Sequence, residues 1–188
     1  MTTGRAGKER QYERLARRFY ARIYSYLRWL CRGQHLAEDL TQQTFVQIWR
    51  HPPQPRGDRP LRAWVYRIAR NEFLQHRRGA GFETITLGDH DDAYEGHGDC
   101  PDPQIRLEQK ELCQAVQSAL HRLPELYREV IVLHNMESLP LSGVAQVLGV
   151  PEGTVKSRRA KAFALLRNML ADEVDPKPMR SSSSPEVG

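Results

Sequence analysis

The sequence predicts an all-helical protein of two small domains, joined by a flexible acidic linker, with a helix-turn-helix in the second domain. Apolar residues recur at helical spacing in several blocks, and no block shows the alternation of a β-strand. A stretch rich in Gly, Asp and His, with hardly any apolar periodicity, divides these blocks into two groups. Near the C-terminus, two helical segments flank a glycine at the spacing of a helix-turn-helix.

The first domain is predicted over residues 11–78, after a flexible N-terminus of residues 1–10. Its first helix begins near Tyr12 and ends near Arg32, with apolar residues on one face and arginines in the remaining positions. A second helix covers residues 36–50 and ends at a cluster of prolines, because proline lacks the amide donor and clashes with the preceding turn. A third helix spans roughly residues 61–78.

The second domain is predicted over residues 105–172, after a linker of residues 79–104. Its four expected helices cover residues 105–120, run from Pro124 to about His134, and follow Ser142 and Pro151. Residues 173–188 contain prolines and four consecutive serines and are predicted to be disordered.

Charge is distributed unevenly along the 188 residues, which carry a net charge of +5. Basic residues dominate residues 1–32 and 56–78, whereas residues 79–108 contain eight acidic residues and Arg106 as the single base. Positive blocks around an acidic strip indicate a protein that binds a polyanion.

The cysteines and the N-terminus favour a cytoplasmic location. Cys31, Cys100 and Cys113 form no C-x-x-C pair and cannot all pair with one another, which fits a reduced setting. The N-terminus is polar, and no apolar run approaches the roughly 18 to 20 residues that span a membrane. Neither secretion nor membrane insertion is expected.

The helix-turn-helix lies in residues 141–161. Ser142 suits an N-cap, Ala145 is small where two helices must approach, and Gly149 permits the positive φ of a tight turn. At 100° per residue, the second helix directs inward Val155, Ala162, Leu166 and Met169. It directs outward Lys156, Ser157, Ala160, Lys161 and Arg167.

A slender basic face of this kind can enter the major groove of DNA with its N-terminal residues nearest the bases and phosphates. The candidate DNA-contacting residues are Glu152, Thr154, Lys156, Ser157, Arg158 and Lys161. The alternative is a solvated basic face on a helical hairpin, and DNA binding is the favoured interpretation.

The third helix of the first domain combines cations with aromatic and amide groups. One apolar face contains Leu61, Trp64, Val65, Ile68 and Ala69. The other side, which includes Tyr66 and His76, suits single-stranded or melted nucleic acid, because arginines pair with phosphates and unstacked bases find aromatic or amide partners. Its candidate residues are Arg62, Arg67, Arg70, Asn71, Phe73, Gln75, Arg77 and Arg78. A solvated arginine-rich face with Trp64 in the hydrophobic core is the alternative.

The helix of residues 36–50 has a polar stripe opposite its apolar face. The stripe contains Asp39, Gln42, Gln43 and Val46, and from the residues alone an ordinary solvated surface is its preferred interpretation.

Four segments together resemble the extracytoplasmic-function (ECF) sigma factors of bacterial RNA polymerase. They are A37-E-D-L-T-Q-Q-T-F-V-Q-I-W49, R62-A-W-V-Y-R-I-A-R-N71, L123-P-E-L-Y-R-E-V-I-V-L133 and G149-V-P-E-G-T-V-K-S-R158. The resemblance covers residues 11–170 in the order of the family, and four linked motifs are more specific than one helix-turn-helix.

The resemblance implies that the chain directs core RNA polymerase to promoters, without enzymatic activity or a cofactor. The polar stripe of Asp39, Gln42, Gln43 and Val46 becomes the contact with the clamp helices of the largest polymerase subunit, and the flap is a further expected contact. Residues 62–78 resemble the segment that melts and reads the minus-10 element, with Asn71 near a flipped base. Residues 152–161 resemble the reader of duplex DNA at the minus-35 element.

The resemblance also implies roles for the linker and for a regulatory partner. The acidic linker matches the family's connector, which threads toward the active-site and RNA-exit channels of the polymerase. An anti-sigma factor that covers the DNA-binding and polymerase-binding faces is a common partner in this family.

Two residues depart from the family pattern. Gln75 stands where an aspartate is frequent, which removes a charge near the melted strand. Arg159 stands where leucine is usual, on the packing face of its helix, so it must reach solvent or bind a phosphate.

Two other classes of protein are alternatives to this interpretation. A conventional transcription regulator with an N-terminal sensing domain leaves the arginine-aromatic helix unexplained. An enzyme could use D89-H-D-D92 and H97-G-D-C100 as metal ligands, but that segment lacks a rigid scaffold, and no catalytic motif accompanies it. Cys31 and His35 are a weak metal-ligand pair, because Gly33 between them indicates a turn.

Overall fold

The computed structural model describes residues 3–31, 33–53, 57–79 and 115–174, and within these ranges every regular element is a helix. This confirms the predicted all-helical class. Most of the predicted linker, the metal-ligand alternative at residues 89–100, the first ten residues of the helix expected at 105–120 and the tail beyond Val174 lie outside the described residues. None of the described helices is both long enough and apolar enough to cross a bilayer.

Helices α1 (Thr3–Leu30), α2 (Gln34–Arg50) and α3 (Asp58–Gly79) form the first group. The expected flexible N-terminus of residues 1–10 is corrected, because α1 is helical from Thr3 onward. Its early turns lie against the end of α2, where the Lys8 ammonium is 4.9 Å from the centre of the Trp49 ring. This contact holds the second turn of α1 against α2.

Helix α1 packs against both α2 and α3, and the buried faces form a hydrophobic core. The largest fully buried side chains of this group include Phe19, Tyr26, Leu40, Ile48 and Tyr66. Two threonines of α2 are also fully buried, because the hydroxyls of Thr41 and Thr44 donate to the carbonyls of Ala37 and Leu40 at 2.6 and 2.7 Å.

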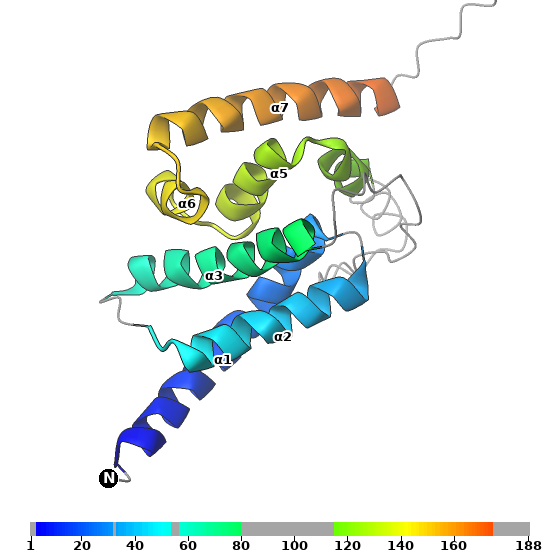
Figure 1. The fold of residues 1–188 in the computed structure, drawn as a ribbon. Helices are drawn as coiled ribbons and strands as arrows, with labels where there is room; N and C mark the ends of the chain where they lie inside the picture. Colours follow the sequence, from blue (N-terminus) through cyan, green and yellow to red (C-terminus); the bar gives the residue numbers. More distant parts are fainter. Residues whose placement is uncertain (1–2, 32, 54–56, 80–114, 175–188) are drawn as a thin grey trace, which may run out of the picture.

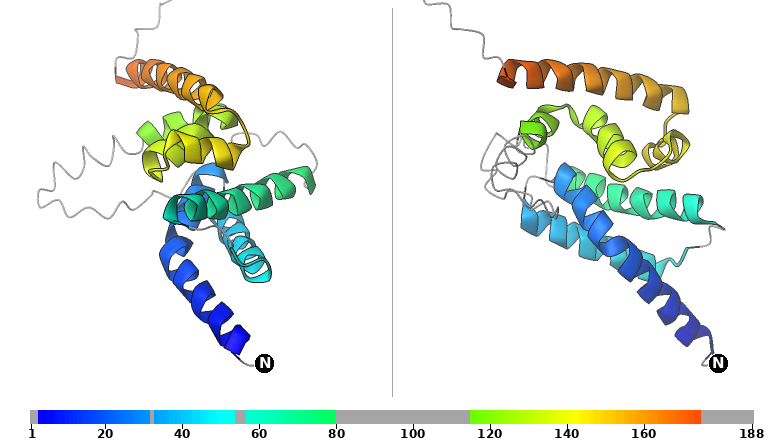
Figure 2. Two further views of the ribbon diagram at one scale, coloured as in Figure 1. Left: turned by 90° about the vertical axis from the view of Figure 1, so that its left-hand side faces the viewer. Right: turned by 180° about the vertical axis from the view of Figure 1, so that it is seen from behind.

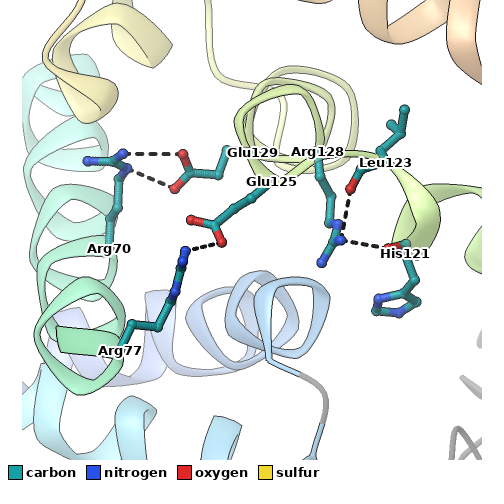
Figure 3. Close-up of polar contacts among 7 residues, drawn as sticks. All are labelled: Arg70, Arg77, His121, Leu123, Glu125, Arg128 and Glu129. Carbon is teal, nitrogen blue, oxygen red and sulfur yellow. Dashed lines mark hydrogen bonds and ion pairs between the residues drawn. The ribbon is translucent and has the colours of Figure 1, made fainter. Parts of the chain in front are cut away.

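The second group contains a helical segment at residues 115–122, α5 (Glu125–Ile131), a π-helical turn η1 (Val132–Met136), α6 (Leu141–Leu148) and α7 (Glu152–Val174). The side chain of Arg128 joins the first segment to α5 by donating to three main-chain carbonyls at 2.6 to 2.9 Å, those of Leu120, His121 and Leu123. Figure 3 shows the contacts with His121 and Leu123. The sequence predicts a helix through about His134 but not its widened final turn.

The two groups of helices pack against each other in layers (Figure 1). Helix α7 lies over α5 and α6, and α3 lies on their other side, with α1 and α2 beyond it (Figure 2). One cluster of buried residues runs through both groups, from Tyr26 and Val65 to Val144 and Val155. The sequence predicts two domains joined by a linker, and this direct packing between them is an additional feature of the structure.

Candidate nucleic-acid interface

Helix α7 has one buried face and one exposed basic face, as its sequence predicts. Val155 and Ala162 are fully buried, and Leu166 is 9% exposed. Each residue predicted to face outward is exposed: Lys156, Ser157, Ala160, Lys161 and Arg167. Among the DNA candidates, Glu152 is exposed, whereas Thr154 and Arg158 are half-buried. The N-terminal end of α7 therefore presents short polar groups and cations to solvent.

The turn before α7 has the geometry of a helix-turn-helix. Gly149 has a φ of 69°, and its amide donates to the carbonyl of Ala145 at 2.9 Å. This left-handed conformation is the one that glycine adopts without a Cβ clash. Ser142 is not the N-cap that the sequence indicates, because α6 begins at Leu141 after Pro140, and no side chain caps it. Pro140 occupies the N-cap position instead, with an extended backbone at φ −63° and ψ 154°.

Arg159 lies half-buried on α7 rather than extending freely into solvent. Its guanidinium lies 5.2 Å from the ring centre of Phe163, and its Nε atom is buried without a hydrogen-bond partner among the described residues. The aromatic contact accounts for part of the stability of a cation in a place where leucine is usual.

Helix α3 carries two polar stripes on different sides. The outer stripe consists of Arg67, Asn71, Gln75 and Arg78, which recur at helical spacing and are all exposed. The inner stripe consists of Arg62, Tyr66, Arg70, Phe73 and Arg77, of which all but Phe73 make polar contacts with the second group of helices. The predicted minus-10 residues are therefore divided between a free surface and an occupied one.

Tyr66 and Phe73 are corrections to the predicted orientation of α3. Both were expected to project outward with the arginines, but Tyr66 is fully buried and Phe73 is 4% exposed. The physical reason is that α3 is covered on two sides, by α1 and α2 and by α6. A periodic pattern in one helix reveals its most apolar face but not a second, mixed face.

The inner stripe is paired with three glutamates of the second group. Arg70 binds Glu129 with both ends of its guanidinium, at 2.8 and 3.3 Å, and Arg77 pairs with Glu125 (Figure 3). Glu137 receives two further contacts: the Tyr66 hydroxyl donates to its carboxylate, and Arg62 donates to its main-chain carbonyl. We call this set of pairs the closed contact.

Two carboxylates of the closed contact are deeply buried. Glu129 is 2% exposed and Glu137 is 6% exposed. Burial raises the pKa of Glu129 more than the neighbouring Arg70 lowers it, and burial also raises the pKa of Glu137 despite its bond to Tyr66. Burial likewise raises the pKa of Tyr66. The closed contact therefore removes ionisable groups from water at a cost that their partners only partly offset.

The predicted polymerase-binding stripe of α2 is exposed along its length. Asp39, Gln42, Gln43 and Val46 are all exposed, and Val46 retains 46% of its surface. The opposite side of α2 is buried against α1 and α3. The stripe lies on a rigid helix and is accessible to a protein partner.

Sequence reasoning missed Glu125, Glu129 and Glu137 as site residues. Their available signal was weak: Glu129 precedes the apolar run V130-I-V-L133, and Glu125 lies one turn before it. A glutamate at the edge of an apolar run can be solvated at a domain surface as readily as paired. Cys31 and His35 are not brought together as a metal-ligand pair, because Cys31 is buried and His35 is exposed beside Glu38.

Two family models match the chain in the order that the resemblance predicts. Sigma-70 region 2 matches residues 15–83, and Sigma-70, region 4 matches residues 113–166. The first match contains both stripes of α3 and the stripe of α2, and the second contains the exposed N-terminal face of α7.

Curated relatives match most of the chain. ECF RNA polymerase sigma factor SigM of Mycobacterium tuberculosis is 32% identical over 166 residues, which cover 88% of this chain and 80% of SigM. SigL of the same species is 35% identical over 138 residues, or 72% of this chain and 75% of SigL. SigE of Mycolicibacterium smegmatis is 32% identical over 171 residues, or 90% of this chain and 65% of SigE.

Solved structures share the fold. CnrH, in complex with the cytosolic domain of CnrY, has a TM-score of 0.64 and 26% identity, with coverage of 89% of this chain and 92% of that one. RpoE of Bartonella quintana, in complex with the anti-sigma factor NepR, has a TM-score of 0.69 and 22% identity, with coverage of 85% and 96%. The chain therefore belongs to the ECF sigma factors, the subunits that direct RNA polymerase to specific promoters.

Proposed function

We propose that α7 reads the minus-35 element in duplex DNA and that α3 melts and reads the minus-10 element. The observation that carries this proposal is the contrast between the two faces of α7, whose inner residues fill the hydrophobic core while Lys156, Ser157 and Lys161 remain exposed. A helix fixed in this way presents its first turns to a groove without reorganising its packing. On α3, the exposed outer stripe supplies cations for phosphates and amides for unstacked bases.

We propose that the exposed stripe of α2 binds the clamp helices of the largest polymerase subunit. Asp39, Gln42, Gln43 and Val46 form a continuous face with one charge and one apolar side chain. Such a face is suited to a polar protein interface rather than to a nucleic acid, because it has no cation. The action on core polymerase and chromosomal DNA implies a cytoplasmic location.

The mechanism requires no catalytic group of this chain. Core polymerase positions the two DNA-reading helices, contacts at two promoter elements add through the tether, and capture of unstacked bases drives strand separation. Arg67 and Arg78 would bind phosphates of the melted strand, and Asn71 would form hydrogen bonds with an exposed base.

An anti-sigma factor is a further proposed partner. CnrH was solved in complex with the cytosolic domain of CnrY, and RpoE with the anti-sigma factor NepR. In this chain a partner of that kind would cover the exposed stripe of α2 or the exposed faces of α3 and α7.

The division of surfaces is tested by two separate variants. The double variant Asp39→Ala with Gln42→Ala should reduce affinity for core polymerase and leave the thermal unfolding curve unchanged, because both residues are exposed. Lys156→Ala should leave polymerase affinity unchanged and weaken binding to promoter duplex. Co-elution of the α2 variant with core polymerase at wild-type affinity would remove this interface from the proposal.

A further inference from the structure

Arg159 of α7 carries a positive charge that is not paired within the described part of the chain. At 100° per residue, its Cα lies about 40° around the helix from that of the buried Val155, on the packing side. The side chain is half-buried, and no hydrogen bond or ion pair joins it to the described residues. Holding a cation on a packing face without a counter-charge costs free energy. An anion from outside the chain would offset that cost.

The terminal nitrogens of Arg159 are available at the surface. Of the three guanidinium nitrogens only Nε is enclosed, so Nη1 and Nη2 reach solvent. The guanidinium lies 5.2 Å from the ring centre of Phe163, which is 43% exposed. Contact with an aromatic face restrains the guanidinium but uses none of its N–H donors. Phe163 therefore keeps Arg159 ready to bind an anion through two parallel hydrogen bonds.

Arg159 lies on the same edge of α7 as one of the candidate DNA contacts. Lys156 precedes it by three positions and Phe163 follows it by four, so all three are neighbours on the helix surface. Glu152 lies one turn before Lys156 and pairs with it at 3.1 Å. The carboxylate on this edge is therefore engaged by Lys156 and does not compensate Arg159.

The neighbouring residue Arg158 differs from Arg159 in its surroundings. At 100° per residue, Arg158 lies about 60° from Val155 on the opposite edge of α7. There it is close enough to Glu129 of α5 to lower the pKa of that carboxyl. Arg158 thus has a carboxylate of its own chain nearby, whereas Arg159 has an aromatic ring and solvent.

A helix that lies in the major groove of DNA has phosphates along both of its edges. The groove is about 12 Å wide, and a helix with its side chains is about 10–12 Å in diameter. The outward face of such a helix meets the bases, and its edges meet the two sugar-phosphate strands. Arg159 lies between Lys156 and Lys161 in sequence, so it is at the same level of α7 as the candidate DNA contacts.

We propose that Arg159, held against the Phe163 ring, binds a backbone phosphate of the DNA strand that borders the minus-35 element. This inference rests on the proposed function of α7. Phe163 is a positioning residue, because it acts on the phosphate through Arg159. A phosphate contact carries no base information, so this pair adds affinity and fixes the register of α7 in the groove without changing which bases are read.

Arg159→Leu tests the phosphate contact in the full chain bound to core polymerase. The DNA is a duplex that covers the minus-35 region of a promoter mapped by transcription in vitro and ends before the minus-10 element. Affinity for this duplex, measured by fluorescence anisotropy, should fall about tenfold, because a charged hydrogen bond to a phosphate is lost. The slope of log affinity against log salt should fall by about 1.

Arg167→Leu is the matched control, since it makes the same substitution at an exposed position of the same helix. It should retain the affinity and the salt slope of the wild type. Arg159→Leu should unfold at the wild-type temperature or above it, because leucine suits a packing face. Phe163→Leu should weaken binding about threefold without changing the slope, since the cation remains but loses the ring that restrains it.

Duplexes with a neutral methylphosphonate at one position at a time identify the phosphate that is bound. The wild type should lose affinity at a position beside the minus-35 element where Arg159→Leu loses nothing further. If Arg159 only supports the fold of α7, both proteins should respond equally at every position. Equal responses would therefore overturn the phosphate contact, even if Arg159→Leu binds more weakly than the wild type.

Lys156→Ala separates this inference from the proposed function on which it rests. If Lys156→Ala binds the duplex more weakly than the wild type and Arg159→Leu does not, the minus-35 role of α7 stands and the contact of Arg159 is wrong. If neither variant loses affinity, both proposals fail.

Discussion

Helices α3 and α7 are both predicted to contact DNA, yet their polar faces differ in how far they are exposed and paired. The outward face of α7 is exposed, and the ion pair between Lys156 and Glu152, at 3.1 Å, joins neighbouring turns of the same helix. On α3, Arg67, Asn71, Gln75 and Arg78 are exposed, whereas Arg70 and Arg77 bind glutamates of α5. Duplex recognition therefore needs no rearrangement of α7, whereas full use of α3 needs the closed contact to open.

The difference follows from what each helix packs against. Helix α7 forms the outer layer, with α5 and α6 on one side (Figure 1). Helix α3 lies in the middle, between the first and second groups of helices. A helix in the middle layer is covered on two faces. Cations on the second covered face are therefore buried only where a counter-charge pairs with them.

The largest expected effect is loss of the buried pair on the inner stripe. Arg70→Ala leaves the Glu129 carboxylate buried without its partner, which should lower the free energy of unfolding by about 3–5 kcal/mol. Urea unfolding of the free protein measures this change. Arg67→Ala, on the outer stripe of the same helix, is the control and should change stability by no more than about 0.5 kcal/mol. Equal losses in the two variants would contradict the division into stripes.

The next effect concerns base capture by the outer stripe. Asn71→Ala should reduce open-complex formation about tenfold, equivalent to about 1.4 kcal/mol, because a hydrogen bond to an unstacked base is lost. Permanganate reactivity of promoter thymines measures it, and footprinting of the minus-35 region should be unchanged. Asn168→Ala makes the same substitution at an exposed position of α7 outside the candidate DNA contacts and should form open complexes normally. If Asn168→Ala is as defective, the role of Asn71 is not specific.

A smaller effect is expected for a single phosphate contact of α7. Lys156→Ala should reduce the slope of log affinity against log salt by about 1 for duplex promoter DNA, since one cation fewer displaces counterions. Titrations at several salt concentrations give the slope. Arg167→Ala, on the same face but three turns farther along the helix, should retain the wild-type slope. If Arg167→Ala lowers the slope and Lys156→Ala does not, DNA would lie at the other end of α7.

The smallest expected effect is that of pH on the closed contact. Burial raises the pKa of Glu129 above its ordinary value of about 4.3, so protonation favours the closed form. The stabilising contribution of Glu129 protonation should be fully present at a pH below the ordinary pKa of glutamate. It should be lost as the pH rises through the raised pKa of Glu129. Urea unfolding across this range measures the stability of wild type relative to Glu129→Gln, and that difference should increase toward acid pH. A difference that decreases toward acid pH would show that the ion pair with Arg70 outweighs burial.

The sequence predicts the helices and the face of α7 well, because these depend on local periodicity. The positions of Val155, Ala162 and Leu166 on the buried side, and the turn at Gly149, follow from spacing alone. The sequence places the start of the first helix near Tyr12, whereas α1 begins at Thr3 and its Lys8 contacts Trp49, which is far away in sequence.

The closed contact could not be predicted from the sequence, because each of its pairs joins residues 48 or more positions apart. The periodicity of α3 identified its arginines but not their partners, and Tyr66 and Phe73 were assigned to the wrong environment. The widened turn η1, which precedes Glu137, has no sequence signature of its own in this chain. Long-range pairing of charges is a property of the packed fold.

Transcription in vitro, with purified core polymerase and genomic DNA as template, tests the central claim that α3 and α7 act together as promoter readers. Mapping of RNA 5′ ends should give discrete start sites that require this protein. Asn71→Ala should weaken initiation at these sites, and Asn168→Ala should preserve it. An absence of protein-dependent start sites, with the protein shown to be folded, would contradict the account.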